Sequence, residues 1–171
     1  MQIELDKLEG SSARFEYTYG GDELVLDDEH ARLVEPPQVT VRLSRSGHDV
    51  RLQGQITARA EVDCDRCLKQ VTVPIETTFD VAYVPASTYV ETEAAELQED
   101  DLGVSVYEDG AIDMDELVRE QVLLTLPTRA LCVEDCKGLC PVCGANRNEN
   151  PCECEPKETD PRWSGLKNLR F

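Results

Sequence analysis

Apolar and polar residues alternate along three stretches of the first half of the chain. The first covers residues 39–43 and ends at the turn-like segment SRSGHD, the second covers residues 50–64, and the third covers residues 71–83. A period of two places successive side chains on opposite faces of a strand, so these stretches predict half-buried β-strands. Shorter alternations within the first 35 residues predict short strands separated by turns. They lie around residues 3–5, 15–19 and 24–26.

A helical pattern follows in the segment AIDMDELVREQVLLTLP. Asp113 with Glu116 three residues later resembles a capping box, and Pro127 supplies a stop. The apolar residues between them recur at helical spacing, which predicts one helix of three to four turns packed on the sheet. These residues are Met114, Leu117, Val118 and Val122.

The segment CDRC lies between the second and third alternating stretches. This position places Cys64 and Cys67 at the tip of an antiparallel hairpin. The pattern therefore predicts an α+β fold, with a mainly antiparallel β domain, one packed helix and a C-terminal cysteine-rich zinc-binding module. The predicted boundaries are 1–90 for the β domain with its CxxC hairpin, 91–112 for an acidic connection, 113–127 for the helix, and 128–171 for the zinc module and tail.

Charge narrows the classes of partner. The chain carries 35 acidic and 17 basic residues, for a formal net charge of -18. A field of this sign repels phosphate backbones, so a basic protein is a more natural partner than bare nucleic acid. No charged and apolar leader and no run of about 18 apolar residues occurs in this sequence, which predicts a cytoplasmic protein. In that reducing compartment, closely spaced cysteines bind metal more often than they form disulfides.

Eight cysteines make up the candidate site. In CPVCG, two intervening residues let a tight turn direct the sulfurs of Cys140 and Cys143 at one ion, and Gly144 tolerates a left-handed conformation. Cys152 and Cys154 then return as CEC to complete four thiolates. The other four cysteines equal the number that a second tetrahedral site requires: Cys64, Cys67, Cys132 and Cys136.

Two partitions of the cysteines remain open at this point. One gives two ions, with the second clamped between the hairpin tip and the segment after the helix. The other gives one ion, bound by Cys136, Cys140, Cys143 and either Cys152 or Cys154, with the remaining cysteines as ordinary thiols. Zinc enclosed by four thiolates is structural because no coordination position is left for water, and iron is an alternative with the same ligands.

Enzymatic chemistry has little support in the sequence. A reactive CxxC usually opens a helix after a strand, whereas CDRC joins two predicted strands, so a thiol redox protein is the weaker interpretation. His30 and His48 both lie in polar, turn-like surroundings, and neither a GxGxxG nor a P-loop motif occurs. We therefore expect a non-catalytic protein.

Four segments in this order resemble the YceD family, the large ribosomal RNA subunit accumulation proteins of bacteria and plastids. They are CDRCL, YEDGAIDMDELVREQVLLTLP, LCVEDCKGLCPVCGANRNENPCEC and DPRWSGLKNL, which span the second two-thirds of the chain. Residues 1–50 fit only by length and strand pattern. The resemblance implies a non-catalytic ribosome biogenesis factor that supports accumulation or processing of large-subunit (23S) ribosomal RNA. Genes of this family often lie beside one for a ribosomal protein, which implies a basic ribosomal protein or a precursor particle as partner.

The last twelve residues carry a locally basic patch. Trp163, Leu166 and Leu169 have helical spacing, which predicts a short C-terminal helix that packs on the protein or contacts RNA. An RNA-binding zinc module is the alternative function. The knuckle itself offers Lys137 and Arg147 but no aromatic ring, so direct RNA contact is disfavoured.

Overall fold

The chain forms two compact units in its computed structural model, which describes residues 1–8, 10–88, 103–155 and 162. The strand unit consists of Met1–Val62 and Thr72–Thr128. The cysteine unit consists of Asp63–Val71 and Arg129–Phe171. Strands and one α-helix make up the regular structure of the described residues, which confirms the predicted α+β class.

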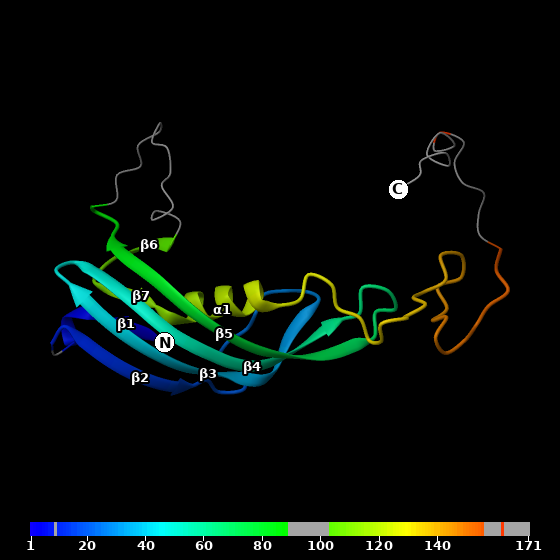
Figure 1. The fold of residues 1–171 in the computed structure, drawn as a ribbon, viewed down its shortest axis with the longest axis horizontal. Helices are drawn as coiled ribbons and strands as arrows, with labels where there is room; N and C mark the ends of the chain where they lie inside the picture. The colour runs from blue at the N-terminus through cyan, green and yellow to red at the C-terminus, as the bar shows by residue number, and fades with distance from the viewer. Residues whose placement is uncertain (9, 89–102, 156–161, 163–171) are drawn as a thin grey trace. The chain divides into compact units, whose positions relative to one another are not determined.

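A five-stranded sheet is the centre of the strand unit (Figure 1). Its strand order is β2-β3-β4-β5-β6, with β2 antiparallel to β3, β3 antiparallel to β4, and β6 parallel to β5. The connection between β4 and β5 is short, as an antiparallel pair allows. The bounds are Ser12–Thr18 for β2, Ala31–Ser46 for β3, Asp49–Asp63 for β4, Gln70–Pro85 for β5 and Val104–Tyr107 for β6.

The alternating stretches match β3, β4 and β5. Within them, most residues that share the predicted apolar parity are buried, while their neighbours are exposed or half-buried. Leu43, Leu52 and Ile75 are among the side chains with almost no exposed surface. Burial on one face therefore fixes the register of the three long strands, because a shift by one residue would expose that face.

Strand β3 begins earlier than its hydrophobic pattern predicts. It runs through Pro36 and Pro37, and its register with β4 shifts between Leu33 and Glu35 and again between Glu35 and Gln38. Proline has no N–H to donate to a ladder, so an irregular stretch of strand is where a sheet accommodates it. The strand predicted around residues 24–26 was wrong, because Leu24 and Leu26 are buried but these residues lie outside every strand.

Helix α1 spans Met114–Thr125 and begins where the capping pattern predicts. The Asp113 side chain accepts hydrogen bonds from the backbone N–H groups of Asp115 and Glu116, at 2.8 and 3.3 Å. Asp113 also ends β7 (Ala111–Asp113), which pairs with β1 (Gln2–Glu4) in a separate two-stranded sheet. A short 3-10 helix, Leu5–Lys7, follows β1. The buried stripe of α1 consists of the four predicted residues, Met114, Leu117, Val118 and Val122.

Some predicted features lie outside the described residues. They are residues 91–102 of the predicted acidic connection and residues 163–171, where the C-terminal helix was predicted. Within the described part of 91–112, the chain forms β6 and β7. Among the described residues, no helix has the length and apolar character that crossing a membrane requires.

Candidate metal centres

The tip of the β4–β5 hairpin, residues 64–69, forms a tight turn that we call the first knuckle. The backbone N–H of Leu68 donates to the Cys64 carbonyl at 2.9 Å, and the Cys64 N–H donates to the Lys69 carbonyl at 2.9 Å. Leu68 adopts φ 59°, in the left-handed region. These bonds curl the chain so that Cys64 and Cys67 lie on the same side of the turn.

Residues 140–145 form the second knuckle, with the same hydrogen-bond pattern. The Gly144 N–H donates to the Cys140 carbonyl at 2.8 Å, and the Cys140 N–H donates to the Ala145 carbonyl at 2.8 Å. Gly144 has φ 74°, at the position that Leu68 occupies in the first knuckle. CDRCL and CPVCG therefore form the same type of backbone turn. Only CPVCG has the glycine by which this turn is recognised in a sequence.

All eight predicted cysteines fall into two groups of four, and within each group the sulfurs lie within 4.8 Å of one another. The first cluster is Cys64, Cys67, Cys132 and Cys136, and the second cluster is Cys140, Cys143, Cys152 and Cys154. The structure thus brings Cys136 to the hairpin tip and not to the second knuckle. This grouping is the two-site partition, and the single-site partition that combined Cys136 with Cys140 and Cys143 disagrees with it.

The sulfur spacing in the first cluster suits a tetrahedral ion. The Sγ atoms of Cys67 and Cys132 are 3.5 Å apart, and those of Cys64 and Cys136 are 3.9 Å apart. Four sulfurs at about 2.3 Å from a zinc ion would lie about 3.8 Å from one another at the corners of a tetrahedron. A disulfide would bring the sulfurs to about 2 Å, and all eight cysteines are free.

Backbone N–H groups favour ionisation of the first cysteine of each knuckle. Burial opposes ionisation of Cys64, but hydrogen bonds from the N–H groups of Arg66, Cys132 and Cys67 outweigh it and lower the pKa of Cys64 to about 6. At the second knuckle, the N–H groups of Cys143 and Val142 lower the pKa of Cys140 to about 6.

One thiol in each cluster strongly resists ionisation while no cation is bound. The adjacent Cys67, together with burial, raises the pKa of Cys132 to about 12. In the second cluster, Cys143 and Cys152 raise the pKa of Cys154 to about 12. Four thiolates this close repel one another, so a divalent cation is the component that would let all four ionise.

Exposure separates the two clusters. Three cysteines of the first cluster are buried and Cys132 is half-buried. Cys64, Cys67 and Cys136 also form a small core, against which Val71, Leu131 and Leu139 pack. In the second cluster only Cys140 is buried, while Cys143 and Cys154 are exposed. An ion in the second cluster would therefore be more accessible to solvent and chelators.

Asn148 supports the first cluster and was not predicted as a site residue. Its Nδ2 donates to Cys136 Sγ at 3.3 Å, and its Oδ1 accepts from the Lys137 N–H at 2.9 Å. This contact orients a candidate ligand from outside the four cysteines. The signal in the sequence, an asparagine in the turn-rich run ANRNENP, is too common to identify such a role.

Gly138 allows the chain after Cys136 to pass close to the first knuckle. Its φ is 70°, and a Cβ at this position would lie 2.8 Å from the Arg66 carbonyl oxygen. The Leu139 N–H donates to the same carbonyl at 2.9 Å, and the Arg66 Nη1 donates to the Cys136 carbonyl at 2.6 Å. Only glycine fits this close approach between the two segments of the first cluster.

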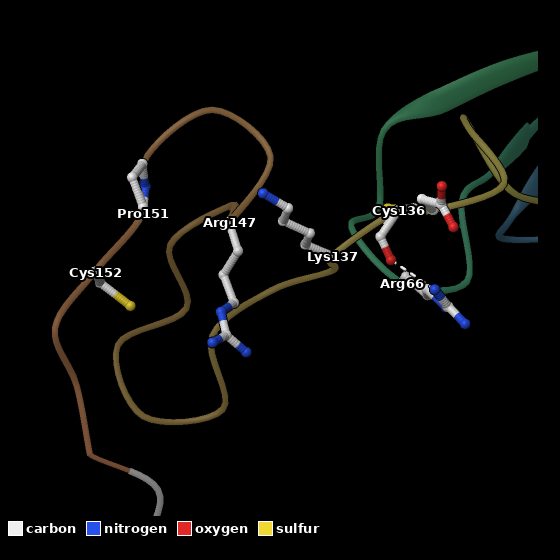
Figure 2. Close-up of a pocket in the computed structure, with 7 residues that line it drawn as sticks. Arg66, Cys136, Lys137, Arg147, Pro151 and Cys152 are labelled. Carbon is white, nitrogen blue, oxygen red and sulfur yellow. Dashed lines mark hydrogen bonds between the residues drawn. The ribbon is translucent and has the colours of Figure 1, made fainter.

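A shallow pocket between the clusters is lined by Arg66, Lys137 and Arg147, with Asp135, Pro151 and the two cysteines Cys136 and Cys152 (Figure 2). Figure 2 shows Arg66 turned toward the Cys136 carbonyl and away from Lys137 and Arg147. The basic side chains thus lie beside the thiolate clusters without converging on one point.

A strand-rich fold with two knuckles and two four-cysteine clusters defines a small protein with a cysteine-rich module. The model of the YceD family, described as large ribosomal RNA subunit accumulation protein YceD, matches residues 52–170. The chain therefore belongs to the YceD family. The match covers both knuckles and all eight cysteines.

Individual relatives are similar to different lengths of the chain. An uncharacterized protein of Mycobacterium leprae is 32% identical over 136 residues, which cover 78% of this chain and 59% of the relative. Bacillus subtilis YlbN is 26% identical over 97% of this chain and 92% of its own length. A chloroplastic protein of Arabidopsis thaliana, named large ribosomal RNA subunit accumulation protein YCED homolog 1, is 41% identical over 59 residues, 34% of this chain and 18% of the relative.

The mycobacterial relatives are longer than the region they share with this chain. The matched region spans 59% of the Mycobacterium leprae protein and 67% of a Mycobacterium tuberculosis protein that is 33% identical. No solved structure matches the chain.

Proposed function

We propose that this protein is a non-catalytic ribosome biogenesis factor that supports accumulation or processing of large-subunit (23S) ribosomal RNA in the cytoplasm. The observation that carries the proposal is the family match over residues 52–170, which includes both clusters. The names of the chloroplastic relatives from Arabidopsis thaliana and Zea mays, large ribosomal RNA subunit accumulation proteins, support it.

The clusters serve this function as structural zinc sites, with four thiolates around each ion. Such an ion has no open position for water or substrate, so its chemistry is to hold the two segments of each cluster together. Iron would fit the same ligands, and elemental analysis of the purified protein distinguishes the two metals. We expect two zinc ions per chain.

A basic protein is the proposed partner because of where the charge lies. The strand unit contains 26 acidic and 8 basic side chains, whereas the cysteine unit contains nine of each. The strand unit thus accounts for the whole formal charge of -18. Electrostatic attraction of a basic ribosomal protein, alone or in a precursor particle, fits this distribution.

The alternative function is an RNA-binding zinc module. One observation supports it, and it comes from the cysteine unit. Its pocket is lined by Arg66, Lys137 and Arg147, and none of the three forms an ion pair with a described residue. Two filled clusters would add about two negative charges each, from four thiolates against one divalent ion. This addition opposes phosphate binding, so the protein partner is the better-supported choice.

Depletion of the protein in cells tests the proposed function. We expect the ratio of 23S to 16S ribosomal RNA to fall and to recover when the wild-type gene is returned. Affinity purification from native lysate should recover a basic ribosomal protein or large-subunit precursor. An unchanged RNA ratio, with neither partner recovered, would reject the proposal, whereas RNA recovered from lysate after removal of ribosomal proteins would favour the alternative.

A further inference from the structure

A groove of about 740 Å³ lies in the strand unit beside β6, β7 and α1. Strand β6 is the last strand in the order of the five-stranded sheet. One side of β6 therefore has no strand partner among residues 1–8, 10–88, 103–155 and 162. An open edge of this kind can pair with an added strand from another chain.

The backbone of Val106 faces that open side. The Tyr107 carbonyl accepts a hydrogen bond from the Ala86 N–H at 3.0 Å, so Tyr107 directs its backbone toward the β5 side. Successive residues of a strand direct their backbone groups to opposite sides, which turns the N–H and C=O of Val106 away from β5. Its side chain is 45% exposed.

The hydroxyl of Tyr83 is available to donate a hydrogen bond in the groove. This residue of β5 is 8% exposed and lines the groove. Its hydroxyl has no hydrogen-bond partner among the described residues, yet every fully buried side-chain N or O atom there has one. The hydroxyl therefore opens into the groove. Burial and the negative charges of Glu120, Glu116 and Asp113 raise its pKa to about 12, so it remains a donor at neutral pH.

Carboxylates surround this opening without cations to balance them. No Lys, Arg or His is among the described residues that line the groove. Four of its carboxylates form no ion pair within the described chain: Glu108, Asp109, Glu116 and Glu120. The fifth, Asp113, caps α1. A cationic ligand is the one that this electrostatic environment favours.

We propose that an extended basic segment of a partner protein binds in this groove as a strand added to β6, with Tyr83 donating to it and its Lys or Arg side chains facing the carboxylates. This inference rests on the proposed function, because it specifies where a basic protein partner would bind. A second copy of the chain is disfavoured as occupant, since a net charge of -18 on each copy would repel across an acidic groove.

Titration of the full chain with a synthetic peptide of alternating lysine and valine tests the groove. We expect saturable binding that weakens as salt is raised. Glu116→Gln with Glu120→Gln should weaken it about 10-fold, because two charge interactions of about 0.7 kcal/mol each correspond to that factor. Tyr83→Phe should weaken it about 3- to 10-fold through loss of one hydrogen bond. The control pair Asp22→Asn with Glu76→Gln, exposed acidic residues outside the groove, should change it less than 2-fold.

Strand addition has its own test at Val106. Val106→Pro removes only the N–H that faces the open edge, where a sheet tolerates proline, while Val106→Thr keeps it. We expect the proline variant, but not the threonine variant, to lose at least 10-fold in affinity with its thermal unfolding midpoint maintained. If Val106→Pro does not fold, a peptide with proline in place of its valines provides the same comparison, and should not bind the wild-type chain.

Three results would overturn the inference. The first is peptide affinity that does not change in the glutamine variant, and the second is equal affinity for the proline-containing peptide. The third is a dimer in sedimentation that Val106→Pro abolishes, because a second copy of the chain would then occupy the edge of β6. Absence of peptide binding while depletion still lowers 23S RNA would reject the groove and leave the proposed function intact.

Discussion

The Phe79 ring of β5 lies against the backbone of Gly54 in β4. A Cβ at residue 54 would lie 2.4 Å from the Thr40 carbonyl oxygen and 2.5 Å from Phe79 Cζ. Gly54→Ala should therefore lower the free energy of unfolding by about 1–3 kcal/mol through overpacking. Urea denaturation measures the change. Gly21→Ala is the matched control, because nothing lies within 4 Å of its added Cβ, and equal losses in both variants would contradict the steric account.

Leu68 and Gly144 occupy equivalent positions in the two knuckles and provide a paired test of backbone strain. Leu68 is 60% exposed with φ 59°, a conformation that costs a non-glycine residue about 1–2 kcal/mol. Leu68→Gly should stabilise the metal-loaded protein by about 0.5–1 kcal/mol after the entropy of glycine in the unfolded chain is subtracted. Gly144→Ala should destabilise it by about 1 kcal/mol. Denaturation with metal in excess measures both, and a change of the same sign in both variants would contradict the equivalence.

These two residues also show what the sequence could and could not predict. In CPVCG the glycine predicts a left-handed residue after the second cysteine, and Gly144 adopts this conformation. In CDRCL a leucine holds that position, and leucine is unfavourable there, so its sequence carries no such signal. The sequence nevertheless predicted that the first knuckle shares an ion with Cys132 and Cys136, because four cysteines are needed for each ion. This count depends on residue type and not on backbone conformation.

At the scale of elements, each cluster joins two segments, and the clusters should lose metal in a fixed order. A chelator reaches the second cluster more easily, because Cys143 and Cys154 are exposed while three ligands of the first cluster are buried. We expect two phases of zinc release with EDTA, each near one ion per chain, measured with a colorimetric zinc indicator.

Cysteine variants assign these phases. Cys143→Ser should remove the fast phase and Cys67→Ser the slow one, since loss of one thiolate opens a closed site. Release in one phase from the wild type, or loss of both ions in each variant, would show that the clusters do not bind metal independently.

The length of a strand determines whether its hydrophobic pattern can be recognised in the sequence. Strands β3, β4 and β5 are long enough for an alternation of apolar residues to repeat several times, and all three were predicted. Strands β6 and β7 have only four and three residues, too few for a period to be recognised, and neither was predicted. The parallel pairing of β6 with β5 depends on contacts between distant parts of the chain, which an alternation pattern does not encode.

At the scale of the whole molecule, metal and hydrophobic burial stabilise different parts of the chain. All eight cysteines belong to the cysteine unit, which includes the hairpin tip at Asp63–Val71 as well as the chain after Thr128. The sequence boundaries placed that tip with the strands, because a pattern read along the chain does not show that residues 64–67 and 132–136 share a cluster. Most of the buried apolar side chains lie instead in the strand unit.

Removal of metal from the full chain should therefore loosen the cysteine unit and leave the strand unit folded. Zinc binding supplies folding free energy to its own site, whereas the sheet and α1 have a core without a candidate ligand. Hydrogen exchange read by mass spectrometry should show faster exchange at 63–71 and 129–155 after chelation, with protection of β3 and α1 changed less than 3-fold. The Cys67→Ser, Cys143→Ser double variant should reproduce the pattern without chelator. Loss of protection in β3 and α1 together with the knuckles would instead show that the two units unfold as one cooperative structure.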